Sequence, residues 1–185
     1  MYKPLKIVTA VLVLMPALVF GGSKNFIDSK DYKDKDFRKC IIQDYSLLTE
    51  ADGIDWSWKK SDIKLSDYKI SLGMLENKAE NKKNSETKAI KNAFTDALSD
   101  IEGEKKIKHL TADVCVYDVQ DFSYGKAWIP FAGYYQMQEG VGIEMILKEN
   151  GQTVAILRDF SRAGERVEDA AKKVATNLTE YIGKN

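Results

Sequence analysis

Residues 141–160 read VGIEMILKENGQTVAILRDF, and this stretch decides the fold of the chain. Apolar side chains occupy every second position from Val141 to Leu147, and a second alternating run covers residues 154–158. Between the two runs stands Asn150-Gly151, a dipeptide that strongly favours a two-residue hairpin turn. The stretch therefore predicts two antiparallel strands joined by a tight turn.

Two more strands are predicted before this hairpin, because apolar residues alternate with polar or small ones there as well. The apolar positions are Tyr68, Ile70, Leu72 and Met74 in the first strand, and Leu110, Ala112, Val114 and Val116 in the second. In the second strand Cys115 falls on the face opposite to the aliphatic side chains.

Apolar residues recur at three- and four-residue steps in two segments, which predicts two amphipathic helices. The first stripe is Ile90, Ala93, Phe94, Ala97, Leu98 and Ile101, with Asn84 or Ser85 as the N-cap and Gly103 as the stop. The second follows Gly164 and is Val167, Ala170, Ala171, Val174, Leu178, Tyr181 and Ile182, with Gly183 at its end.

The predicted elements follow one another as strand, helix, strand, strand, strand, helix. This order favours the α+β class, as a two-layer sandwich in which a mixed four-stranded sheet carries both helices on one face.

The chain starts with the layout of a secretory signal peptide, because Lys3 and Lys6 precede an apolar run over residues 7–20 and small residues follow. A bilayer span needs about 20 apolar residues, and this run is shorter. We therefore expect residues 1–22 to be cleaved off during export, with an uncleaved membrane anchor as the alternative. Ser23 stands where a lipoprotein would have its acylated cysteine, so no lipid anchor is expected.

The remaining chain divides into two parts. Lysines and aspartates crowd residues 23–39 without apolar periodicity, which is typical of a flexible tether. Residues 40–185 are long enough for a single α+β domain with its own core. Removing Lys3 and Lys6 from the 28 basic residues leaves 26 against 28 acidic ones. Such a balance gives no electrostatic basis for binding nucleic acid.

Cys40 and Cys115 are the only cysteines, so one intramolecular disulfide is the sole pairing within the chain. Export favours this bridge, and the alternative is two buried thiols that pack as small apolar side chains. Because Cys115 points away from the aliphatic side of its strand, a bridge requires the chain around Cys40 to cross the opposite face of the sheet.

Residues 123–138 combine aromatic side chains with glycines. Trp128, Phe131, Tyr134 and Tyr135 are the candidates for contact with a partner or a ligand. Packing over the sheet is the alternative, because aromatic residues serve in both roles.

The sequence contains no recognised catalytic, phosphate-binding or zinc motif. His109, the only histidine, is expected at the start of a strand without a nucleophile or metal ligands around it. We therefore expect no catalytic residue, no metal and no cofactor.

Three stretches carry a family resemblance: DYSLL at 44–48, DIKLSDYK at 62–69, and the hairpin 141–160 with the helix after Gly164. Together they resemble an uncharacterised family of bacterial secreted proteins and lipoproteins, known as a domain of unknown function. The order of elements is also loosely similar to periplasmic domains of the curli-secretion and Tol-system amino-terminal type, which are envelope assembly and interaction modules.

The sequence thus predicts an exported, periplasmic or secreted protein of a Gram-negative envelope that acts as a non-enzymatic interaction or assembly module, with an envelope protein as its partner. Two alternatives stay open. The first is a periplasmic binding protein for a small apolar ligand, in a cavity bordered by Trp128, Phe131 and Tyr135. The second is a hydrolase that uses two converging carboxylates.

Overall fold

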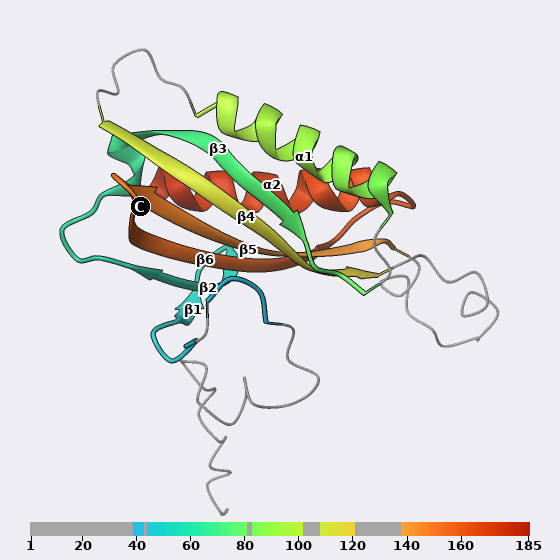
Figure 1. Ribbon diagram of the computed structural model, residues 1–185, viewed down its shortest axis with the longest axis horizontal. Helices are drawn as coiled ribbons and strands as arrows, with labels where there is room; N and C mark the ends of the chain where they lie inside the picture. Colours follow the sequence, from blue (N-terminus) through green and yellow to red (C-terminus); the bar gives the residue numbers. More distant parts are fainter. Residues whose placement is uncertain (1–38, 43, 81–82, 102–107, 121–137) are drawn as a thin grey trace, which may run out of the picture.

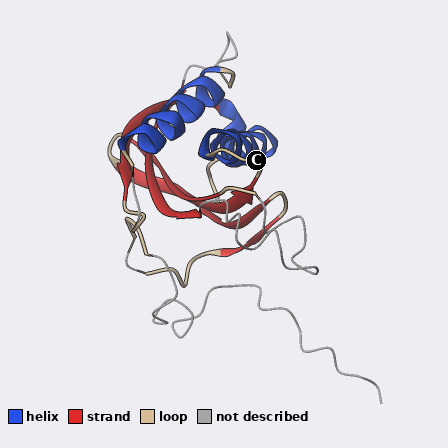
Figure 2. Ribbon diagram, turned by 90° about the vertical axis from the view of Figure 1, so that its right-hand side faces the viewer, coloured by secondary structure: helices blue, strands red, loops and turns tan. Residues whose placement is uncertain are grey.

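The computed structural model describes residues 39–42, 44–80, 83–101, 108–120 and 138–185. The predicted signal peptide and the predicted tether up to residue 38 lie outside these ranges, and so do the candidate residues Trp128, Phe131, Tyr134 and Tyr135. The described residues confirm the α+β class, because one mixed sheet carries two helices on the same face (Figure 1, Figure 2).

The sheet contains six strands, in the spatial order β1-β2-β6-β5-β4-β3. Their bounds are β1 Thr49–Ala51, β2 Ile54–Lys59, β3 Tyr68–Asn77, β4 Lys108–Gln120, β5 Gly140–Glu149 and β6 Gln152–Arg162. Strands β3 and β4 are parallel, and all other neighbours are antiparallel. A short 3-10 turn, η2 (Leu65–Asp67), leads into β3.

The prediction of four strands was wrong, because β1 and β2 add to the sheet beyond β6. Strand β1 has three residues, too few for an alternation to show in the sequence. In β2, Ile54 belongs to the core beneath the helices, whereas Trp56 and Trp58 pack on the opposite side. Apolar residues on both faces hide the pattern of a half-buried strand.

Strands β5 and β6 confirm the predicted hairpin. Asn150 and Gly151 have φ angles of 51° and 81°, which is the left-handed conformation that a type I′ turn requires at both central positions. Asparagine and glycine reach this region at low cost.

A β-bulge in β6 follows the turn. Lys148 of β5 pairs with Thr153, but Leu147, the residue before it in β5, pairs with Ala155. Val154 is therefore the extra residue of the bulged strand. As a result Val154 and Ala155 both join the core beneath the helices, and the alternation expected over residues 154–158 is interrupted.

Helix α1 spans Asn84–Ser99 and helix α2 spans Val167–Lys184. The residues that α1 buries are Ile90, Ala93, Phe94 and Leu98 from the predicted stripe, together with Glu86. Those that α2 buries are Ala170, Ala171, Val174, Ala175, Leu178, Tyr181 and Ile182. Both helices therefore turn their apolar stripes to the sheet, and α2 continues one residue past Gly183.

The N-cap of α1 is Lys83, one residue before the predicted Asn84 or Ser85. The Glu86 side chain accepts a hydrogen bond of 3.2 Å from the Lys83 backbone N–H and lies 2.8 Å from the Lys83 ammonium group. An acidic residue in the first turn stabilises a helix start, because unpaired N–H groups give that end a partial positive charge.

Strand β3 departs from its predicted alternation at Met74. A register shift lies between Leu72 and Leu75, and Leu75 takes the position that packs against the core. Met74 is consequently 54% exposed.

Two hydrophobic cores lie on the two faces of the sheet. The larger one fills the space between the sheet and the helices, and we call it the helix-side core. The smaller one lies on the face without helices, which we call the outer face, and consists of Tyr45, Leu48, Ile146 and Ile156. The chain that precedes β1 thus supplies half of the smaller core.

Candidate functional site

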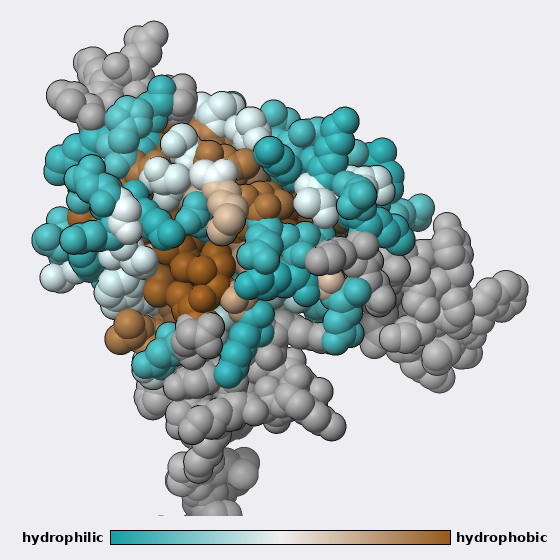
Figure 3. Space-filling view, viewed as in Figure 1, coloured by the Kyte–Doolittle hydropathy of each residue, from teal (hydrophilic) through white to brown (hydrophobic). Residues whose placement is uncertain are grey.

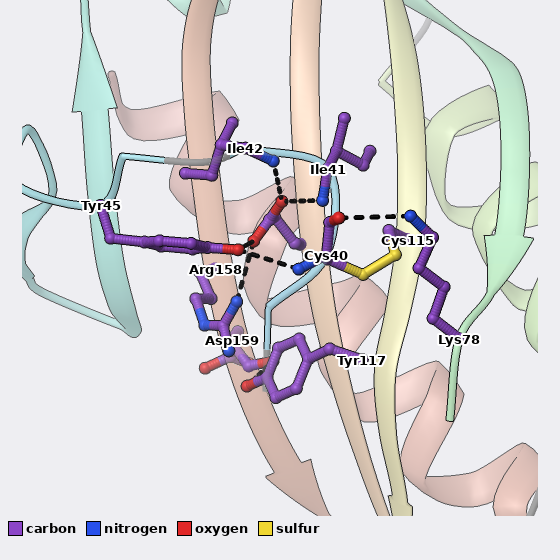
Figure 4. Close-up of polar contacts among 10 residues, drawn as sticks. Cys40, Ile41, Ile42, Tyr45, Lys78, Cys115, Tyr117, Arg158 and Asp159 are labelled. Atoms are coloured by element: carbon purple, nitrogen blue, oxygen red, sulfur yellow. Dashed lines mark hydrogen bonds and ion pairs between the residues drawn. A yellow bond between two sulfur atoms is a disulfide. The ribbon is translucent and has the colours of Figure 1, made fainter. Parts of the chain in front are cut away.

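The segment that precedes β1 covers part of the outer face, and we call it the strap (residues 39–42 and 44–48). Figure 4 shows Cys40, Ile41, Ile42 and Tyr45 of the strap around polar side chains that rise from the strands. Among the described residues no strand of the sheet pairs with the strap. The strap is therefore not held by a β-ladder.

The predicted disulfide between Cys40 and Cys115 is confirmed, and the alternative of two buried thiols is wrong. The two Cα atoms lie 6.0 Å apart, within the usual range for a disulfide. The expected geometry is confirmed as well, because the strap crosses the outer face to reach Cys115, while Val114 and Val116 point into the helix-side core.

Glu144 of β5 is the central residue of the site and is fully buried. Its Oε1 atom accepts hydrogen bonds from the backbone N–H groups of Ile41 and Ile42, at 2.7 and 3.0 Å. Its Oε2 atom accepts from the Tyr45 hydroxyl at 2.6 Å and from Nη1 of Arg158 at 2.8 Å. Four donors surround this carboxylate, and the strap provides three of them.

The strap also bonds around Cys40. The Cys40 backbone N–H donates to the Tyr45 hydroxyl oxygen at 2.9 Å, and the Cys40 carbonyl accepts from the Lys78 ammonium group at 3.3 Å. The N–H of Cys40, the Tyr45 hydroxyl and the Glu144 carboxylate thus form a chain of hydrogen bonds beside the disulfide (Figure 4).

Arg158 of β6 lies between two tyrosines. Its guanidinium carbon stands 3.7 Å from the ring centre of Tyr117 and 5.3 Å from that of Tyr45. Stacking on aromatic faces suits the planar guanidinium, which is more weakly hydrated than an ammonium group. The same guanidinium forms a buried ion pair with Glu144, with 2.8 Å between Nη1 and Oε2.

The two tyrosine hydroxyls remain protonated at neutral pH. Burial raises the pKa of Tyr45, and the hydrogen bond to Glu144 and the charge of that carboxylate raise it further. Burial also raises the pKa of Tyr117, although the charge of Arg158 acts in the opposite direction. A protonated Tyr45 can donate to Glu144, as the geometry requires.

The hairpin bulge brings Glu144 and Arg158 together. The two residues are direct cross-strand partners. The pairing Lys148–Thr153, continued without the extra residue Val154, would instead place Leu157 opposite Glu144. One residue of bulge thus decides which side chain of β6 faces the carboxylate.

Gly142 leaves room for the Tyr117 ring that stacks on Arg158. A Cβ atom at this position would overlap the ring of Tyr117, which is the extra residue of a second register shift, between Val116 and Asp118 of β4. The missing side chain lets the ring lie over β5 beside Arg158.

A second buried polar cluster joins β6 to α2. The Oδ2 atom of Asp159 accepts hydrogen bonds from the Ser161 hydroxyl at 2.9 Å and from the Asn177 amide at 3.0 Å. Asp55 lies beside this cluster at the surface, where its carboxylate accepts from the Phe160 backbone N–H at 2.9 Å. Partial desolvation, followed by the charge of Asp159, raises the pKa of this carboxyl group. The bonds of Asp159 fasten the last helix to the sheet.

A shallow groove of about 370 Å³ runs between α1 and α2. The polar residues that line it are Ser85, Lys88, Asn92, Asp96, Glu168 and Lys172. Lys172 already pairs with Glu168 at 2.7 Å. In the described part of the chain, no three His, Cys, Asp or Glu side chains lie together as metal ligands would.

Of the residues that the sequence singled out, the structure brings together Cys40 and Cys115. His109 lies in β4 near its start and is exposed. Sequence reasoning missed Glu144 and Arg158. A signal was present, because β5 is apolar at nearly every position, which indicates that both of its faces are covered. A glutamate within such a strand needs a buried cation.

No family model matches the chain, and no curated protein matches it. Among solved structures it is similar to the PelC dodecamer from Paraburkholderia phytofirmans, with 12% identity over 69% of this chain and 92% of that chain and a TM-score of 0.43. A second PelC dodecamer from that organism, a variant with a single substitution, gives 14% identity, 69% and 91% coverage and a TM-score of 0.36. The third structure is of a protein from Caulobacter crescentus CB15 whose name suggests a lipoprotein. Its identity is 13% over 65% of this chain and 90% of that chain, and its TM-score is 0.37. At these identities and TM-scores no function is transferred to this chain.

Neither of the two described helices has the length and apolar character needed to cross a bilayer.

Proposed function

We propose that this chain is an exported protein of the bacterial envelope that acts as a non-enzymatic interaction or assembly module. The observation that carries the proposal is the Cys40–Cys115 bridge. Disulfides form and persist in oxidising compartments and are rare in the cytosol. The signal-peptide layout of residues 1–22 supports the same location.

The use of the buried charges supports a role other than catalysis. Glu144, Arg158 and Asp159 are bonded to groups of the fold itself and are closed to solvent. A catalytic carboxylate must reach its substrate, and none of these side chains lines the groove between α1 and α2. Nothing in this part of the molecule favours the hydrolase.

An apolar ligand is not favoured either. The groove between α1 and α2 is open to solvent, and six of the eight residues that line it are polar or charged, whereas ligand sites for apolar molecules are enclosed and carry few polar groups. Trp128, Phe131 and Tyr135, the residues expected to border a cavity, lie outside the described residues.

The surface offers apolar area for protein contact. In Figure 3 hydrophobic residues gather in the middle of one face and hydrophilic residues surround them. Leu47 and Met74 are large apolar side chains that are more than half exposed. Contiguous apolar area with a polar rim is typical of protein interaction sites.

Export is tested by expressing the tagged chain in its source bacterium, separating cytosol from periplasm and alkylating free thiols under denaturing conditions. We expect a chain shortened by its leader in the periplasmic fraction, with thiols that react only after reduction. A cytosolic chain with two reactive thiols would overturn the proposal.

The interaction role is tested by cross-linking and co-purification of envelope partners. We expect Trp128→Ala and Tyr134→Ala to lose partners that the parent chain retains, while Lys173→Ala on the exposed side of α2 keeps them. A set of partners that is unchanged in both aromatic variants removes the aromatic segment as the contact site.

A further inference from the structure

The strap is attached to the fold in a way that allows it to move as a unit. It continues into β1, at the edge of the sheet, and no described strand pairs with it. Two of its backbone N–H groups bond to a side chain, that of Glu144, where a strand would bond to a neighbouring backbone. Segments with few ladder bonds open locally at lower cost than the global unfolding of the chain.

The core that the strap completes is separate from the main one. Tyr45 and Leu48 of the strap pack on Ile146 and Ile156 of the outer face, and the sheet separates this cluster from the helix-side core. Lifting the strap therefore exposes the outer face without disturbing the packing of α1 and α2.

The disulfide lies beneath the segment that it fastens. Cys115 is fully buried and Cys40 is 6% exposed. A thiolate must approach a disulfide sulfur directly to exchange with it. A reductant can therefore attack this bridge only after the strap has lifted. The bridge itself disfavours lifting, because it ties the strap to β4.

From this geometry we propose that the strap is a latch: it opens and closes as a local unit, and oxidation of Cys40 and Cys115 locks it closed over the outer face. The two thiols give two electrons and two protons to a disulfide-bonded oxidant. One cysteine thiolate attacks the oxidant's disulfide and releases one of its thiols. The second cysteine then attacks the mixed disulfide, forms the Cys40–Cys115 bond and releases the other thiol.

The latch makes the part of the outer face beneath the strap accessible only in the dithiol chain. Before oxidation the face presents Ile146, Ile156 and the Glu144–Arg158 pair, and afterwards the strap covers all four. The occupant of this face in the oxidised protein is thus the chain's own strap. The inference needs the bridge but not the interaction role proposed above, so the two can fail separately.

The first test measures how fast excess dithiothreitol reduces the bridge in the folded protein, with alkylation and mass measurement at each time point. Glu144→Gln removes the charge that binds three strap donors, and we expect reduction to become about 10-fold faster or more, because hydrogen bonds to charged groups are the stronger ones. Glu180→Gln makes the same chemical change at an exposed ion pair with Lys184, and we expect its rate to match the parent chain.

Leu98→Ala separates local from global opening. Leu98 is buried in the helix-side core, so its truncation destabilises the whole fold and leaves the strap contacts intact. We expect the rate of reduction to stay within about twofold of the parent, since the strap opens without global unfolding. If Leu98→Ala accelerates reduction as much as Glu144→Gln does, or if neither does, the latch is overturned.

The second test follows hydrogen exchange in Cys40→Ala/Cys115→Ala, which cannot form the bridge. We expect the amides of residues 40–48 to lose far more protection than those of α1 and α2, whose protection falls only by the global destabilisation that comes with the loss of the closed loop. A strap that remains equally protected shows that the bridge does not lock it, and helices that lose as much protection as the strap show that the bridge holds the whole fold and not the strap alone. Either result overturns the proposal.

Discussion

A carboxylate that loses its water must find other donors, and Glu144 has four of them. Moving an ion into the protein interior costs several kcal/mol, which attraction to a partner offsets only when further hydrogen bonds complete the geometry. Here Arg158 provides the charge and the strap provides the remaining donors. Glu144 and the strap therefore depend on each other.

Glu144→Ala should be among the most destabilising single changes in the chain. It leaves Arg158 buried without its carboxylate and the N–H groups of Ile41 and Ile42 without their acceptor. Breaking a buried ion pair from one side costs about 3–5 kcal/mol, so we expect a loss of that size in urea unfolding. Glu180→Ala, at an exposed pair, is the matched control and should change the stability little. A loss near that of the control would show that the donors find water when Glu144 is absent.

Stability should also fall in alkaline solution because of Tyr45 and Tyr117. Burial holds the pKa of each hydroxyl above its usual value of 10.0, so the folded chain keeps protons that the unfolded chain releases above that pH. As the pH rises beyond 10, each tyrosine then lowers the free energy of unfolding by up to about 1.4 kcal/mol per pH unit. Below pH 10 the stabilisation from each tyrosine is fully present.

Urea unfolding at about pH 9 and pH 11 measures this slope. Tyr117→Phe cannot ionise, so we expect its stability to fall less steeply than that of the parent between the two pH values. Equal slopes would mean that Tyr117 is not the group that titrates.

At the scale of the elements, two register shifts shape the outer face. The bulge in β6 sets Glu144 opposite Arg158, and the shift in β4 turns Tyr117 over β5. The Tyr117 ring occupies the space above Gly142, where any side chain would collide with it. The strand interior thus contains a glycine for a packing reason, which offsets its low strand propensity.

Gly142→Ala should displace the Tyr117 ring and weaken its stack on Arg158. Overpacking a filled site typically costs about 1–3 kcal/mol, and we expect a loss in that range by thermal or urea unfolding. Gly183→Ala is the matched control, because a Cβ there meets nothing within 4 Å. Near the end of α2 the control should be neutral or slightly stabilising. If both variants behave alike, the ring moves aside without cost.

Local patterns predicted the elements that are half-buried and regular. The β5–β6 turn follows from Asn150-Gly151, and both helices follow from their apolar stripes, because these signals lie within a few neighbouring residues. Strand β1 escaped because it has only three residues. Strand β2 escaped because Ile54 joins the helix-side core while Trp56 and Trp58 pack on the outer face, which removes the alternation.

The candidate site was predictable only in its disulfide. The alternation of apolar residues in one strand predicts that Cys115 faces away from the helices. A bridge to a cysteine on that face requires the strap to cross it. The pair Glu144–Arg158 depends on the bulge at Val154, and this bulge places Val154 and Ala155 together in the core that β6 shares with the helices. Such a one-residue shift is decided by tertiary packing, and a single sequence does not reveal it.

At the scale of the whole molecule, the bridge joins two parts that are 75 positions apart. The loop that it closes contains β1, β2, β3, α1 and the first part of β4. Both edge strands of the sheet and one helix therefore lie inside the loop. It also links the smaller core to a strand that lines the larger one. Restriction of the unfolded chain is therefore its main contribution to stability, since a loop of this length loses many conformations when its ends are tied.

Cys40→Ala/Cys115→Ala should accordingly lower the free energy of unfolding by about 4 kcal/mol, the loop-closure value for this separation. Urea unfolding monitored by the helical circular dichroism signal measures the loss, because α1 and α2 report on the main fold rather than on the strap. Each single variant removes the same loop, so Cys40→Ala and Cys115→Ala should each lose as much as the double variant. A single variant that differs strongly from the other would show that local packing at that cysteine, and not the closed loop, determines the effect. A loss below about 1 kcal/mol in all three would contradict the loop-closure account and imply an unfolded chain that is compact without the bridge.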